Sequence, residues 1–249
     1  MFSWAFLGTS LLLCTTLLNQ YENYPSMTIS EVFGGSIVGA LVFASVMSSI
    51  ARRHSFTRIL EGMTRPLGLS SFATGFGLLS GKMGIRGVSL REATLGNAFS
   101  ISLHGQGVVA ISPKLASSLS AEETEAVLAH ELAHIKNGDS NAKGLARLAR
   151  SAFPFDPVLR LVEAAVHRER ELWADRVAVS FTGKPLALAS ALVKANARPK
   201  PLATEHNAGL FIGGSRRGLL SPYPNLERRV DALIELARQM EVAILAIAA

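Results

Sequence analysis

Two histidines four residues apart, with a glutamate directly after the first, stand out in the stretch LAHELAHIKNGD at 128–139. On a helix, side chains at i and i+4 lie on one face, so His130 and His134 can converge on one ion. Glu131 then lies about 100° round the helix, beside that ion. This pattern is typical of a zinc site in which the glutamate takes a proton from the water that the metal activates. The alternative is an amphipathic helix whose two histidines are buried in a core.

A third ligand must lie elsewhere in the chain, because a catalytic zinc keeps three protein ligands. His167 stands among arginines and His206 in a glycine- and proline-containing region, so neither is favoured. Glu171, in the stretch ERELWAD, is the better candidate. Asp175 follows it one helical turn later and could accept the N–H of a ligating histidine. Glu169 is the rival ligand, but no carboxylate follows it four residues on.

The elements that must position these residues are mostly helical. Ser120 and Glu123 form a capping-box pattern and Asn137-Gly138 a stop signal, which together predict a helix over 121–137. Three further helical patterns cover 156–183, as one helix or two pieces, then 185–197 and 224–249.

Strand-like residues at 85–112 include SISLHGQGVVAIS, which predicts a hairpin with His104 near its tip. A histidine there is more typical of a turn than of a metal ligand. The glycine- and proline-rich region 198–222 is predicted to be a mobile loop. We therefore predict a mainly α (α+β) fold, with N-terminal transmembrane helices followed by a helical zincin domain with a small β-sheet.

The N-terminal residues favour membrane insertion. Residues 2–18 and 32–51 carry no charge, in a chain of 249 residues that is 49% apolar with mean hydropathy +0.29. The second stretch has the length of about 20 residues that a transmembrane helix needs. A signal peptide is the alternative for the first, but no Lys or Arg precedes its apolar run. The sequence thus predicts an anchor of two transmembrane helices over 1–54 and a metallopeptidase domain over 55–249.

Charge sets the expected orientation and partners. Arginines follow the second stretch and none stands in the loop before it, so the positive-inside rule predicts a multi-pass protein of the inner membrane with a cytoplasmic catalytic domain. The net charge of +6 is spread along the predicted helices without an aromatic-interleaved patch. This favours membrane lipids over nucleic acid as partners. The one cysteine, Cys14, excludes an intrachain disulfide and a cysteine zinc site. A third apolar stretch, 66–81, is too short to span and is predicted to be buried or interfacial.

The stretch HELAHIKNGD, followed by ELWAD, resembles the membrane-bound glutamate-type zinc peptidases, which include the HtpX-type and CAAX-processing proteases. The resemblance extends from about Asn97 to Leu233. It implies that His130, His134 and Glu171 bind one Zn²⁺ per chain. Glu131 would then be the general base and Asp175 the support of a ligating histidine. NAFS at 97–100 is similar to the substrate-side strand of that family.

One departure from the family lies near the C-terminus. The HtpX-type pattern reads Thr-His-Pro before an arginine-containing helix, whereas this chain reads SPYPNLERRVDAL. Alignment on Arg229 puts Tyr223 in place of the histidine. Its phenol O–H could stabilise an oxyanion, or the residue could merely pack against or cap the last helix.

The expected function is a membrane-anchored zinc endopeptidase (EC 3.4.24) of membrane protein quality control. Its substrates would be proteins or peptides, misfolded membrane proteins among them. FPFDPVLRLVEAAVHRERELWAD also resembles the BlaR/MecR sensor metalloproteases, so a regulatory or sensor protein with a zinc site is one alternative. A non-catalytic membrane protein is another. CAAX processing is a third, disfavoured because those enzymes carry more spanning segments.

Overall fold

The computed structural model describes residues 15–16, 19, 29–67, 70–94, 97–103, 105–139, 157–197 and 225–248. The chain divides into two compact units, Met1–Thr57 and Arg58–Ala249. Helix α2 (Ile29–Met63) begins in the first unit and ends in the second. Across the described stretches, no helix is both long enough and apolar enough to traverse a membrane. The predicted span 32–51 lies within α2, and the predicted span 2–18 lies almost entirely outside the described residues.

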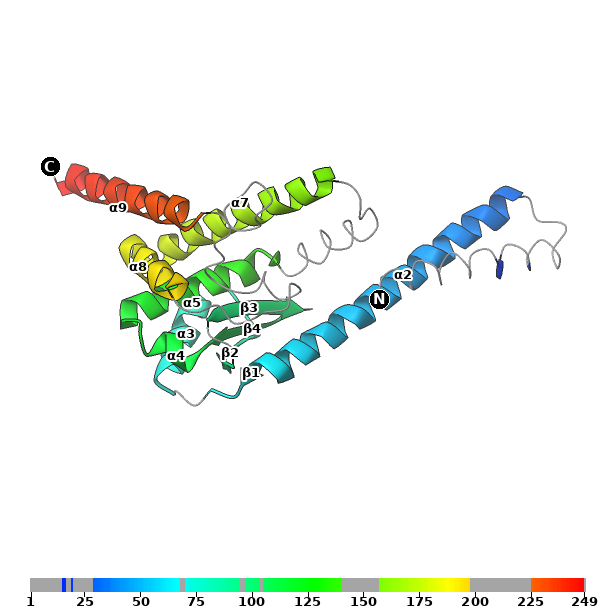
Figure 1. Ribbon diagram of the computed structural model, residues 1–249, viewed down its shortest axis with the longest axis horizontal. Helices are drawn as coiled ribbons and strands as arrows, with labels where there is room; N and C mark the ends of the chain where they lie inside the picture. The colour runs from blue at the N-terminus through cyan, green and yellow to red at the C-terminus, as the bar shows by residue number, and fades with distance from the viewer. Residues whose placement is uncertain are drawn as a thin grey trace. The chain divides into compact units, whose positions relative to one another are not determined.

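A small mixed sheet forms one layer of the second unit (Figure 1). Its strand order is β1-β2-β4-β3, with bounds β1 (Thr64–Arg65), β2 (Val88–Ala93), β3 (Ala98–Leu103) and β4 (Gln106–Ile111). The predicted hairpin is confirmed, because β3 and β4 pair antiparallel with Leu103 opposite Gln106. Gly105 makes the turn with a φ of 81°, a value that favours glycine. His104 lies outside the described residues. The parallel pairing of β2 with β4 was not predicted.

The apolar stretch 66–81 contributes most of helix α3 (Ser70–Lys82). Phe76 and Leu79 are buried, and α3 packs against the central helix α5, whereas Leu78 on another face is exposed. The prediction of a buried segment is therefore confirmed for one face of this helix. A short helix, α4 (Pro113–Ala116), connects β4 to α5.

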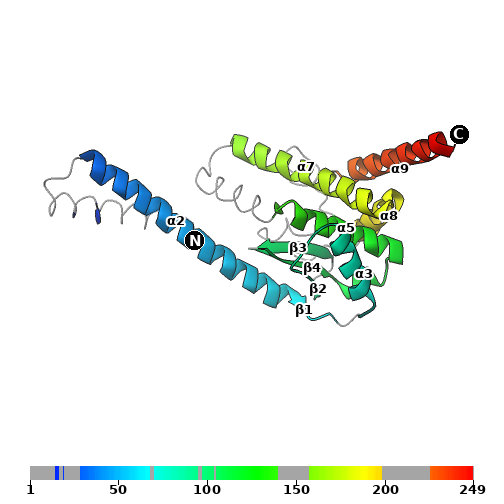
Figure 2. The same ribbon diagram turned by 180° about the vertical axis from the view of Figure 1, so that it is seen from behind.

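Helix α5 (Ala121–Lys136) is the centre of the unit. It lies between the sheet and helices α7 and α8 in both views (Figures 1 and 2). The predicted capping box is present, since the Glu123 amide donates to Ser120 Oγ at 3.2 Å and the Ser120 amide donates to Glu123 Oε2 at 2.7 Å. Because α5 has neighbours on several sides, its middle is buried almost all round, and its small side chains allow close packing.

Three long helices complete the unit, namely α7 (Pro157–Thr182), α8 (Pro185–Asn196) and α9 (Leu226–Ala248). The described part of the region predicted as one or two helices is the single helix α7. Gly183, with a φ of 68°, ends α7, and Pro185 begins α8. Both α7 and α8 pack against α5, and α9 packs against α8 and α7. The mainly helical α+β prediction is confirmed, and the predicted loop 198–222 lies outside the described residues.

Candidate metal centre

The two histidines of α5 point the same way. Their Nε2 atoms are 3.1 Å apart, and their rings stand at 89° to each other with centroids 4.7 Å apart. Helix α7 brings Glu171 to this pair, because α5 and α7 pack side by side. Glu171 Oε2 is 3.6 Å from His130 Nε2, and Glu171 Oε1 is 3.5 Å from His134 Nε2. One ligand atom from each of the three residues lies within 4.8 Å of the others.

These separations suit a single small cation. Two nitrogen atoms bound to one tetrahedral zinc at about 2.0–2.1 Å are about 3.3 Å apart. The three separations among His130, His134 and Glu171 are 3.1, 3.5 and 3.6 Å, close to that value on every side. The ligand types, two imidazoles and a carboxylate, are also those of a catalytic zinc site. The three residues therefore fit a metal ion such as zinc.

Each histidine meets an aspartate through its other ring nitrogen. His130 Nδ1 lies 2.9 Å from Asp175 Oδ1, and His134 Nδ1 lies 2.6 Å from Asp139 Oδ2. The His134 contact is a hydrogen bond and assigns the ring proton of that residue to Nδ1, because a carboxylate only accepts. The His130 contact with Asp175 is within ion-pair distance but lacks hydrogen-bond geometry. His134 Nε2 then turns its lone pair toward His130 Nε2 and Glu171 Oε1. His134 Nε2 and Glu171 Oε1, two acceptors 3.5 Å apart, are the kind of atoms that a shared cation would hold together.

Two arginines hold these carboxylates in place. The buried Arg229 of α9 donates to Asp175 Oδ2 through Nε at 2.8 Å and to Glu171 Oε2 through a terminal nitrogen at 3.0 Å. Arg170 of α7 donates to Asp139 Oδ1 through Nε at 2.8 Å and also contacts it through a terminal nitrogen. Planar guanidinium groups suit this task, since they offer several donors in a fixed fork.

The electrostatics keep the carboxylates ionised. Burial alone would raise the pKa of Glu171, Asp175 and Asp139, but the neighbouring histidines and arginines outweigh it and lower all three, Glu171 well below its usual value. For Arg229, the facing carboxylates outweigh burial and raise its pKa. Three carboxylates therefore face two guanidinium groups, which leaves negative charge for a cation to balance.

The pKa of His130 reflects the same imbalance. Burial disfavours the charged ring, yet Asp175 and Glu171 outweigh burial and raise its pKa to about 9. Without a metal, a proton on His130 thus balances part of the negative charge of Asp175 and Glu171. The carboxylates around this ring therefore stabilise positive charge, whether it is a proton or a metal ion.

The predicted site residues divide into those brought together and those that are not. His130, His134, Glu171 and Asp175 lie close together, and Glu131 is buried on α5 directly after His130. The rival ligand Glu169 is exposed on α7, outside the group that converges. Tyr223 and His206 lie outside the described residues, so their proposed or rejected roles stay predictions.

Three contributors were missed by sequence reasoning. No role was assigned from the sequence to Asp139 or Arg170, and Arg229 was used only to align the C-terminal stretch. Asp139 alone left a usable signal, because its carboxylate follows Asn137-Gly138 directly. The other two pairings join residues 31 and 54 positions apart, which no local pattern reveals.

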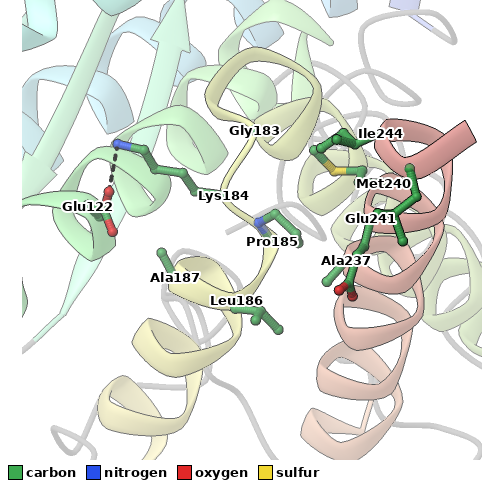
Figure 3. A pocket seen from close by; sticks show the side chains of 11 residues that line it. Glu122, Gly183, Lys184, Pro185, Leu186, Ala187, Ala237, Met240, Glu241 and Ile244 are labelled. Carbon is green, nitrogen blue, oxygen red and sulfur yellow. Dashed lines mark ion pairs between the residues drawn. The ribbon is translucent and has the colours of Figure 1, made fainter. Parts of the chain in front are cut away.

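A separate hollow of about 400 Å³ lies where the α7–α8 turn faces α9 (Figure 3). Most of its lining is apolar, with contributions from Pro185, Leu186, Ala237, Met240, Ile244 and Leu245. Lys184 at its rim pairs with Glu122 at 3.4 Å and with Glu125 at 2.8 Å, so its charge is already matched. None of the metal-binding candidates lines this hollow, and we do not assign the chemistry to it.

A helix that carries two histidines one turn apart, crossed by a second helix that supplies a glutamate, defines a metal site of the zinc-peptidase class. The comparisons with known proteins agree. The family model described as BlaR1 peptidase M56 matches residues 100–209. Among curated proteins, the chain is 32% identical over 183 residues to a Protease HtpX homolog of Methanopyrus kandleri, covering 58% of each chain. It is 33% identical over 182 residues to the Protease HtpX homolog of Aquifex aeolicus, covering 55% of this chain and 60% of the relative.

A further relative is the Protease HtpX homolog of Burkholderia thailandensis, 31% identical over 193 residues, which cover 61% of this chain and 68% of the relative. The chain belongs to the family of HtpX protease homologues. It spans 58% and 60% of the length of the homologs from Methanopyrus kandleri and Aquifex aeolicus. Among solved structures, the crystal structure of S. mikatae Ste24p shares the fold, with a TM-score of 0.54 at 15% identity over 93% of this chain and 63% of that one.

Proposed function

We propose that this protein is a zinc-dependent endopeptidase with one Zn²⁺ per chain. The observation that carries the proposal is the convergence of His130, His134 and Glu171 at separations of 3.1 to 3.6 Å, with Glu131 buried beside them. Zinc, when bound, would polarise the scissile carbonyl and make the attacking water more acidic. Family membership supports the same reading.

The residues of the chain divide the remaining work. Glu131 takes the proton of the attacking water and later gives it to the leaving amine. Glu171 and the two histidines hold the metal, while Asp175 orients His130 and Arg229 holds both carboxylates on α7. Tyr223 is a candidate donor to the oxyanion that forms during attack.

Substrate binding is proposed at strand β3. It is the outermost strand on its side of the described sheet, and it packs against α5, the helix that carries the histidines. A peptide laid along β3 in extended form would be recognised largely through its main chain, which tolerates many sequences. Such tolerance suits a protease that removes misfolded membrane proteins.

Membrane anchoring through residues 1–54 belongs to the same proposal. Residues 32–51 are uncharged, and α2 exposes Val38, Val42, Val46 and Ile50 at four-residue spacing. Arginines after this stretch favour a catalytic unit on the cytoplasmic face of the inner membrane. The full chain should stay with membranes after alkaline carbonate extraction, and its release into the soluble fraction would contradict the anchor.

The decisive experiment on activity compares Glu131→Gln with a matched control, Glu169→Gln. Glu131→Gln should keep zinc and lose proteolysis by at least about 10²–10⁴-fold, the usual contribution of a general base. Glu169→Gln removes an exposed carboxylate from the neighbouring helix and should cleave casein normally. Full casein cleavage by Glu131→Gln would refute the assigned base. A comparison of membrane proteomes carrying active and Glu131→Gln protein would then identify the substrates.

The match to the BlaR1 peptidase M56 model favours one second candidate, a regulatory metallopeptidase that responds to a signal. A zinc-loaded wild-type protein that cleaves neither casein nor itself would favour that role. Cleavage of several unrelated membrane proteins would favour quality control.

A further inference from the structure

Asp139 reaches the metal centre through a glycine turn of the backbone. Five residues after His134, a continuing helix would place position 139 about 140° away from that histidine. Helix α5 instead ends at Lys136 with Asn137 as its C-cap, and Gly138 takes a φ of 66°, which an L side chain rarely adopts. The chain therefore folds back, and the buried Asp139 brings Oδ2 to 2.6 Å from His134 Nδ1.

Arg170 holds Asp139 from the neighbouring helix. Its Nε donates to Asp139 Oδ1 at 2.8 Å, and a terminal nitrogen donates to the Asn137 carbonyl at 3.3 Å. Arg170 directly precedes Glu171 on α7, and successive helical side chains point about 100° apart. Helix α7 thus sends Arg170 to the support behind His134 and the next side chain, Glu171, to the inward face of the site.

We propose that Asp139 and Arg170 form a positioning pair that fixes His134 for metal binding. This inference rests on the metal site of the proposed function. The two oxygens of Asp139 have separate partners, since Oδ2 faces the histidine and Oδ1 faces the arginine. The carboxylate accepts the Nδ1 proton, so the Nε2 lone pair stays turned inward, and the guanidinium fork keeps the carboxylate from rotating away.

The pair has a counterpart behind the other histidine. His130 meets Asp175, which Arg229 holds from α9. Each ligating histidine therefore has its own aspartate, and each aspartate its own arginine. Arg229, which holds Asp175, also contacts the ligand Glu171. Asp139 and Arg170, by contrast, contact only His134 among the ligands in the described contacts. Removing the Asp139 charge therefore isolates the orientation of one histidine.

The test is the zinc affinity of the full-length protein, measured by competition with a chelating dye, beside the melting temperature of the zinc-free protein. Asp139→Asn keeps the shape of the side chain and removes its charge, and should weaken zinc binding about 10–100-fold. The matched control is Glu123→Gln at the opposite end of α5, which also removes a buried carboxylate paired with a cation. It should lower the melting temperature and leave zinc affinity unchanged.

A second pair of variants tests the link to Arg170. If Arg170 acts through Asp139, Asp139→Asn combined with Arg170→Met should bind zinc no more weakly than Asp139→Asn alone. Should Asp139→Asn fail to fold, Arg170→Lys makes the same test, because it keeps the charge and loses the fork. Lysine there should weaken zinc binding in a protein that melts normally.

Three results would overturn the inference. Wild-type zinc affinity in Asp139→Asn is the first. The second is a loss of affinity in Asp139→Asn and Glu123→Gln that simply follows their melting temperatures, because that pattern marks a structural role only. The third is a loss of zinc-binding free energy in the double variant equal to the sum of the losses in Asp139→Asn and Arg170→Met alone. Such additivity would mean that Arg170 does not act through Asp139. Absence of zinc from the wild-type protein is a different outcome, because it would refute the proposed function itself.

Discussion

The two ends of helix α5 use the same kind of interaction for different purposes. At its N-terminus, the Glu123 carboxylate accepts from Ser120, from Ser190 at 2.6 Å and from Lys194 at 2.7 Å. At its C-terminus, the Asp139 carboxylate accepts from Arg170 and faces His134. Both are buried carboxylates matched by a cation from another helix.

The partners of Glu123 and Asp139 show which of the two carboxylates has a structural role and which belongs to the metal centre. Every partner of Glu123 in the described contacts is a donor that is not itself in contact with a metal-ligand candidate. The arrangement therefore joins α5 to α8 and is structural. Asp139 instead touches a ring whose second nitrogen turns toward His130 and Glu171. A buried charge pair thus indicates function when one of its members also contacts a residue whose other polar atom lies among converging ligand atoms.

The largest expected effect concerns two cations that pair with buried carboxylates, Arg229 at the metal centre and Lys194 at the N-terminal end of α5. Arg229→Met leaves Asp175 and Glu171 without their buried partner and should destabilise the protein by about 3–5 kcal/mol. The control Lys194→Met removes a cation whose side chain is 43% exposed. It should cost about 1 kcal/mol or less, since water screens such a pair. Urea unfolding measures both, and equal losses would break the distinction between a buried and a half-exposed cation.

Removal of the carboxylate at the structural end should have an intermediate effect. Glu123→Ala leaves the Ser120 amide and the Ser190 hydroxyl without their acceptor, at a cost of about 1–3 kcal/mol in the free energy of unfolding. Zinc affinity should stay at the wild-type value. A loss of zinc binding in a folded Glu123→Ala protein would show that both ends of α5 serve the site.

The same end should also give stability a dependence on pH. Burial would raise the pKa of Glu123, but Lys194, Ser190 and Ser120 outweigh it and lower the pKa below the usual 4.5. The unfolded chain therefore binds this proton more readily, so the stabilisation is complete above pH 4.5 and declines as the pH falls through the folded pKa. The difference in unfolding free energy between wild type and Glu123→Gln should shrink as the pH drops below 4.5. A difference that grows with acidity would contradict the assignment.

The smallest effect compares two helix-ending glycines. Gly138 and Gly183 have φ values of 66° and 68°, and each has open space where a Cβ would stand. Alanine at either position should cost about 1–2 kcal/mol, the strain of a left-handed backbone. Only Gly138→Ala should also weaken zinc binding, because only Gly138 turns Asp139 toward His134. Equal zinc affinities in the two variants would argue against a role for this turn.

The sequence predicted the elements whose signals are local. The capping box of Ser120 and Glu123 set the start of α5, and the spacing of His130 and His134 placed both rings on one face. The hairpin of β3 and β4 followed from alternating apolar residues around Gly105. In each case the information lies within a few residues of the chain.

The structure added what depends on tertiary contacts. The Arg229–Asp175 pair joins α9 to α7 across 54 residues, and the parallel pairing of β2 with β4 joins strands that are not consecutive. The role of Asp139 required the φ of Gly138, which a stop signal alone does not specify. The helical pattern predicted where α5 ends but not that its last turn brings a side chain back to the site.

The central claim is that one metal ion is held by His130, His134 and Glu171. The most direct test is the zinc content of the purified full-length protein, with Glu171→Ala beside its neighbour Glu169→Ala. We predict one zinc per chain in the wild type and in Glu169→Ala, and almost none in Glu171→Ala. A wild-type protein without stoichiometric zinc, or a Glu171→Ala protein that keeps it, would contradict the claim.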